Sequence, residues 1–163
     1  MEYELKKIKR FNTRNGRIFE ALLYKGDKKI GDVEEKDDGS SAWLHKEVGI
    51  TEKDIIEFVA WHKEVVGLHW TSKFLSEDKT DFTNAVSFII DITEATLDSK
   101  NKILFLVDED ELFTQSLMMK GTTISDTVAL KQIYRDYPKA LVFDPTVQNF
   151  LRISEFGFEK VVS

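Results

Sequence analysis

The chain has 163 residues, of which 42% are hydrophobic, with only two prolines and eight glycines, so it can bury a core and is not disordered by composition. It contains no cysteine, which excludes disulfides, thiolate nucleophiles and cysteine-based zinc sites. The net charge of −6 disfavours loose binding to nucleic acid, and neither a membrane span nor a secretory signal is evident, so we expect a cytoplasmic protein.

The first third of the chain predicts an antiparallel meander within residues 1–41. Apolar and polar residues alternate from residue 3, and one slip at Lys6-Lys7 indicates a bulge. Asn15-Gly16 favours a tight turn, because both residues tolerate positive φ. Strands are expected over residues 3–11, 17–25 and 29–35.

A helix is expected from Glu52 to about Val66. Thr51 is its predicted N-cap, Asp54 suits the third helical position, and Gly67 is its predicted stop. Its apolar stripe, which predicts the core face, consists of Ile55, Ile56, Val59 and Val66.

The remaining pattern alternates between helices and apolar strands. Further helices are predicted over residues 82–97, 111–120, 126–136 and 147–153, with Thr80 or Asp81 capping the first and Ser125 the third. Further strands are predicted over residues 102–107, 139–143 and 158–162. The sequence therefore predicts one α+β domain over 1–163, with a meander (1–41) covered by the helical and mixed part (51–163).

All tryptophans and histidines fall in one short stretch, and we interpret them as a partner-binding segment. They are Trp43, His45, Trp61, His62, His69 and Trp70. Two other interpretations stay open. The tryptophans could fill the joint between meander and helices, and the three histidines could hold a catalytic zinc ion, although their spacing matches no zinc motif.

The charges are unevenly distributed. The first 30 residues are basic, and acidic residues follow in the blocks 32–38, 77–81 and 108–111. The six acidic residues that we predict to bind a partner are Asp37, Asp38, Asp108, Glu109, Asp110 and Glu111. They would form an acidic face that occupies a basic groove on another protein; the alternative is ordinary solvated surface, and the 108–111 cluster could also bind Mg²⁺.

One stretch resembles the opening hairpin of small uncharacterised proteins of phages and other mobile elements. The resemblance runs from Phe19 through Ala21, Leu23, Tyr24, Lys28 and Ile30 to Gly31, and continues at Asp37-Asp38-Gly39. The chain departs from the pattern at three places: Gly26-Asp27 stands where it has Asp-Gly, Asp37 where it has Asn, and Ser40-Ser41 where it has a glycine pair. The resemblance implies an accessory role and no particular chemistry.

We therefore expect a non-enzymatic accessory protein that binds and inhibits a host protein, such as a nucleic-acid-cleaving, CRISPR-like defence component. No metal, cofactor, membrane or direct nucleic-acid contact is expected. One alternative is a metal-dependent enzyme that uses His45, His62 and His69 or the 108–111 carboxylates. Another is a domain that sequesters a small molecule or nucleotide in a pocket of Trp43, Trp61 and Trp70.

Overall fold

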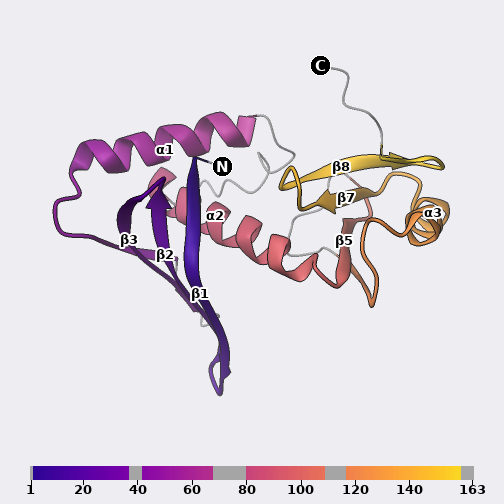
Figure 1. Ribbon diagram of the computed structural model, residues 1–163, viewed down its shortest axis with the longest axis horizontal. Coiled ribbons are helices and arrows are strands. Elements are labelled where there is room, and N and C mark those ends of the chain that lie inside the picture. Colours follow the sequence, from indigo (N-terminus) through magenta and orange to yellow (C-terminus); the bar gives the residue numbers. More distant parts are fainter. Residues whose placement is uncertain (1, 37–41, 68–79, 109–116, 159–163) are drawn as a thin grey trace. The chain divides into compact units, whose positions relative to one another are not determined.

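The protein is an α+β fold, described by a computed structural model (Figure 1). The structure describes residues 2–36, 42–67, 80–108 and 117–158. These residues form two compact units, the first from 2–36, 42–67 and 80–93 and the second from 94–108 and 117–158. The predicted fold class is confirmed, whereas a single domain over 1–163 stays a prediction.

The first unit contains the predicted meander as a four-stranded antiparallel sheet with the order β1-β2-β3-β4. Its strands are β1 (Tyr3–Thr13), β2 (Gly16–Lys25), β3 (Lys28–Lys36) and β4 (Trp43–Lys46). The alternation slip at Lys6-Lys7 is a register shift between Lys6 and Lys9, where Lys7 has a φ of 50°. The predicted bulge is therefore confirmed.

The turn between β1 and β2 forms at the predicted place. Gly16 has a φ of 113°, while the Thr13 hydroxyl donates to the Gly16 carbonyl at 2.9 Å and accepts from the Asn15 amide at 3.2 Å. Only glycine adopts this φ without strain, so Gly16 rather than Asn15 provides the conformational freedom.

The helix α1 (Glu52–Gly67) begins with the predicted cap. The Asp54 amide donates to the Thr51 hydroxyl at 3.4 Å, and the Thr51 amide donates to the Asp54 carboxylate at 2.9 Å. These reciprocal bonds satisfy amides that the first turn leaves without helical partners.

The core face predicted for α1 is only partly correct: Ile55 and Val59 are half-buried, and the side chain of Val66 lies outside the described residues. Ile56 is 61% exposed, and the buried residues are Phe58, Trp61 and His62. These three are spaced i, i+3 and i+4, so they also form a helical stripe. The helix turns this stripe inward because the rings of Phe58 and Trp61 each lie 5.0 Å from the buried ring of Tyr3 on β1.

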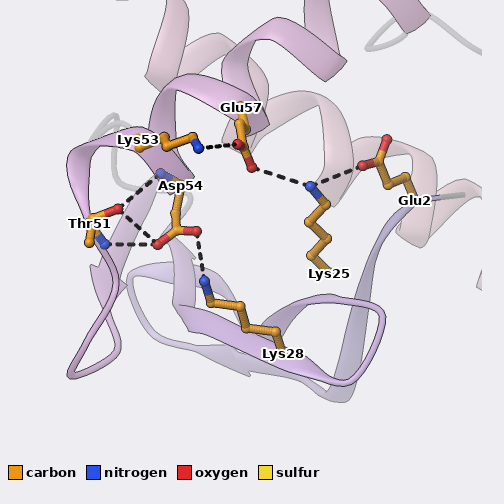
Figure 2. A network of polar contacts seen from close by, with 7 residues as sticks. All are labelled: Glu2, Lys25, Lys28, Thr51, Lys53, Asp54 and Glu57. Atoms are coloured by element: carbon orange, nitrogen blue, oxygen red, sulfur yellow. Dashed lines mark hydrogen bonds and ion pairs between the residues drawn. The ribbon is translucent and has the colours of Figure 1, made fainter.

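Ion pairs join α1 to the turn between β2 and β3 (Figure 2). Lys28 lies 2.7 Å from Asp54, and Lys25 lies 3.3 Å from Glu57 and 3.2 Å from Glu2. Two of the basic residues of the N-terminal segment are therefore neutralised within the fold.

The helix α2 (Asp81–Asp98) begins where the sequence predicts it, and the hydroxyl of Thr80 accepts the Thr83 amide at 3.2 Å. Val86, Ile89 and Ile90 of the predicted stripe are completely buried. Among the residues that the structure describes, no helix is long and apolar enough to cross a membrane.

The second unit contains a five-stranded antiparallel sheet with the order β6-β5-β7-β8-β9. Its strands are β5 (Lys102–Leu106), β6 (Leu117–Lys120), β7 (Leu141–Asp144), β8 (Asn149–Ser154) and β9 (Gly157–Phe158). The helix α3 (Thr127–Asp136) packs Ala129, Leu130 and Ile133 into a core with Ile103 and Val142.

Three predictions in this unit are wrong. Residues 117–120 and 149–154 are strands rather than helices, because they pair with β5 and β7. Asp126, not Ser125, caps α3, since its carboxylate accepts the amides of Val128 and Ala129. The predicted helix residues 111–116 and strand residues 159–162 lie outside the described residues.

Candidate functional site

The sheet of the first unit has one buried face and one face that α1 does not cover. Tyr3, Leu5, Phe19, Leu23 and Leu44 point into the core. Alternate residues along each strand point to the other side. We call that other side the open face.

Strand register arranges the open face in two rows across the sheet. One row is Lys9, Glu20, Glu34 and Trp43, and the next is Lys6, Leu22, Asp32 and His45. All eight side chains are exposed or half-buried. The open face therefore mixes cations, carboxylates, an imidazole and an indole over four strands.

A hollow of about 380 Å³ lies on this face. Lys7 and Lys9 line it from β1, Glu20 and Leu22 from β2, and His45 from β4, together with Asp32 and Glu34 of β3. The bulge brings Lys7 to the hollow, as β-bulges commonly redirect a side chain. Lys7 also holds a left-handed φ of 50°, an uncommon conformation for a residue with a side chain.

The carboxylates of the hollow are only partly neutralised. Lys29 lies 2.8 Å from Asp32 and 2.7 Å from Glu47, and these hydrogen bonds raise the pKa of Lys29. Glu34 pairs with Lys36 at 3.1 Å, but Glu20 stands directly opposite Glu34 in the register. Like charges directly opposite each other on neighbouring strands destabilise a sheet, so a bound cation would relieve this pair.

Trp43 is a large and exposed aromatic side chain of the open face. It is 59% exposed, and its ring contacts the His45 ring edge-on at 5.7 Å. An exposed tryptophan held by a neighbouring ring is typical of a contact surface rather than a core.

The other two described members of the aromatic and histidine segment lie in the core, which corrects their prediction as surface anchors. Trp61 is 8% exposed and lies among Tyr3, Phe58 and Phe88. It thus fills a joint between strands and helices, as one of the alternatives for the tryptophans had it.

His62 is 2% exposed, and its ring lies 5.0 Å from that of Phe88. Its Nδ1 has no hydrogen-bond partner among the described residues. Burial lowers the pKa of His62 to about 4, opposed by the nearby Asp81 carboxylate and reinforced by Lys63. The imidazole is therefore neutral near pH 7.

The alternatives that join these residues are not supported by their positions. His45 lies on the open face and His62 in the core behind it, so the two do not form one metal site. Trp43 and Trp61 are separated in the same way and do not line a common pocket. Within the described ranges, no group of three or more His, Asp or Glu side chains could hold a metal ion.

Most of the predicted acidic site lies outside the described residues, as do His69 and Trp70. The acidic residues concerned are Asp37, Asp38, Glu109, Asp110 and Glu111. Asp108, which follows β5, is half-buried.

Sequence reasoning missed Lys7, Glu20, Asp32 and Glu34 as members of a site. The sequence contained part of the information needed to find them, because the Asn15-Gly16 turn fixes the register of β1 and β2 and so aligns Lys9 with Glu20. No family model, no curated protein and no solved structure matches this chain.

Proposed function

We propose that this chain is a non-enzymatic binding protein of phage or mobile-element origin that docks on a host protein through the open face and blocks it. The observation that carries the proposal is the exposed Trp43 beside a hollow lined with charges. Aromatic anchors supply binding energy at interfaces, and charges supply orientation and encounter rate. The proposed phage or mobile-element origin rests on the resemblance of the opening hairpin to small proteins of such elements.

The chemistry of the hollow favours a cationic partner surface. Glu20 stands opposite Glu34, whose carboxylate pairs with Lys36, so an arginine or lysine of the partner would bind Glu20 and share Glu34 with Lys36. The same strand leads into Asp37 and Asp38, which extend the acidic segment. A basic nucleic-acid groove on a nucleic-acid-cleaving defence component has the matching charge.

The test compares Trp43→Ala with Ile56→Ala. The two side chains are 59% and 61% exposed but lie on β4 and α1, so the second variant is a matched control for loss of an exposed apolar group. A partner is captured from host lysate, purified, and its binding measured by surface kinetics.

We expect Trp43→Ala to raise the dissociation rate at least tenfold, which corresponds to about 1.4 kcal/mol or more, as for an interface anchor. Ile56→Ala should leave it unchanged. Equal rates for both variants would place the interface elsewhere on the protein. Inhibition of the captured partner's nuclease activity then tests the blocking role separately.

A further inference from the structure

We propose a second interaction surface: the outer end of the β1–β2 hairpin, residues 7–18, is an arm that binds duplex nucleic acid through its phosphates. This arm uses residues other than Trp43 and His45. It shares Lys7 and Lys9 with the hollow of the open face, so Arg14 and Trp43 are the residues that separate the two roles.

The first observation is a strong asymmetry of charge. The arm together with Lys6 just before it has no acidic residue and six cations: Lys6, Lys7, Lys9, Arg10, Arg14 and Arg17. Since the whole chain carries −6, the remainder carries −12. The arm is thus a cationic element on an acidic molecule.

The second observation is that the arm projects. Ile18 pairs with Lys36, the last described residue of β3, and from Phe11 to Arg17 no described residue adds a third strand to the hairpin. Residues 9–15 are all exposed. Figure 1 shows this end of the hairpin, in indigo, extending away from α1.

The third observation is how the cations are used. Lys25, Lys28 and Lys29 form ion pairs inside the fold. By contrast, neither Lys9 nor Arg14 forms an ion pair with any residue that the structure describes. Lys6, just before the arm, pairs with Glu4, and Arg10 and Arg17 also have interactions within the chain. Within the described residues, the positive charge that the fold leaves without an ion pair is therefore that of residues such as Lys9 and Arg14.

The register distributes these cations around the ribbon. Lys9 points to the open face, Arg10 and Arg17 point to the opposite face, and Arg14 lies in the turn. A two-stranded β-ribbon fits the major groove of a duplex, where phosphates line both walls. Lys9 and Arg14 thus place unpaired positive charge on one face and at the tip of the ribbon, where such a groove would bring phosphates.

An apolar pair lies among these cations. Phe11, 42% exposed, stands directly opposite Ile18 on the open-face side of the arm. In a groove this pair would contact sugars and thymine methyl groups. Repulsion from the acidic remainder would favour an approach in which the phosphates meet the arm.

The test is fluorescence anisotropy of the full chain with a labelled duplex DNA of about 20 base pairs over a salt series. We expect micromolar affinity at low salt, with a slope of log K against log salt of about −3 to −5. Lys9→Gln and Arg14→Gln should each reduce this slope by about 1. Phe11→Ala should weaken binding without changing the slope.

Lys46→Gln and Lys139→Gln are the matched controls, because both lysines are exposed and lie outside the arm. They should leave affinity and slope unchanged. Trp43→Ala should also leave duplex binding unchanged, which separates this surface from the docking role. Urea unfolding of every variant shows that the fold is retained.

Three results would overturn the proposal. One is an absence of binding at the lowest salt, and another is equal loss in the arm and control variants. The third is a different ligand preference. If single-stranded DNA binds as tightly as the duplex, the arm does not recognise a duplex groove. If polyglutamate competes as well as DNA does, the ligand of the arm is an acidic protein surface.

Discussion

Gly31 decides how closely β4 approaches β3. It is buried, and a Cβ at this position would overlap the carbonyl oxygen of His45 and lie 2.9 Å from the Leu44 Cδ1. The neighbouring register shift between Leu23 and Tyr24 lies at the same place. Because Gly31 has no Cβ, β4, the strand that carries Trp43 and His45, can lie close to β3.

Gly31→Ala should destabilise the first unit by about 1–3 kcal/mol, because the backbone of β4 has to move to relieve the overlap. Urea unfolding followed by circular dichroism measures this loss. Gly121→Ala is the contrast, since its Cβ would meet nothing within 4 Å and only its φ of 77° opposes the change. If Gly31→Ala loses no more than a few tenths of a kcal/mol, close packing of β4 is not what requires glycine at residue 31.

His62 makes stability depend on pH. Its pKa is about 4 in the folded chain against 6.5 for an unperturbed histidine, so between these values the unfolded chain binds the extra proton. The contribution of His62 to the free energy of unfolding should therefore be fully present above about pH 6.5. It should fall by on the order of 2–3 kcal/mol as the pH approaches 4. His62→Leu should remove that part of the slope between pH 7 and 4 in urea melts. An identical slope in the variant would mean that carboxylates alone cause it.

At the scale of single elements, local signals were sufficient where one pattern dominates. The Asn15-Gly16 turn, the slip at Lys6-Lys7 and the Thr51 cap each act within a few residues, and each is found in the structure. The helices predicted over residues 117–120 and 149–154 were wrong because these residues pair as strands with β5 and β7, and that pairing decides their conformation.

The candidate site was predictable only in part for the same reason. Trp43 and Trp61 look alike in sequence, yet β4 exposes one and α1 buries the other. The face of α1 that turns inward depends on Tyr3, about 60 residues earlier in the chain, and no local pattern contains that information. Likewise, Glu20 and Glu34 become neighbours only through strand register.

The cap at the start of α1 can be tested through the pH dependence of stability. Hydrogen bonds from Lys28 and from the Thr51 amide lower the pKa of Asp54 to about 2, from a usual value near 3.8. Because the folded pKa is the lower one, this carboxylate stabilises the fold above about pH 4, and the stabilisation disappears as the pH falls toward 2. Asp54→Asn should lower the thermal midpoint at pH 7 and flatten its decline between pH 4 and 2. Glu52→Gln, at the first position of α1 beside the cap, is the control and should change both much less.

At the scale of the whole molecule, the charge is polarised. Six cations lie between residues 5 and 19, and the remainder carries −12. Such a distribution orients the protein as it approaches a charged partner, through fields that salt screens over about 8–10 Å. The two proposed roles therefore make opposite demands, because the carboxylates of the open face and the acidic blocks would bind a cationic surface, whereas the arm would bind phosphates.

Neutralising the acidic blocks should separate these demands. Changing Asp37, Asp38, Glu109 and Glu111 to Asn or Gln should alter stability by no more than about 0.5 kcal/mol, as surface substitutions usually do. Binding to the captured host protein should weaken through a slower association rate, and the wild-type affinity should fall steeply with salt. Duplex binding by the arm should instead strengthen, because repulsion of phosphates is removed. Kinetics with both ligands over the same salt series measure this. A host-protein affinity that is independent of salt and unchanged by the four substitutions would exclude charge mimicry and leave Trp43 and the hollow as the basis of recognition.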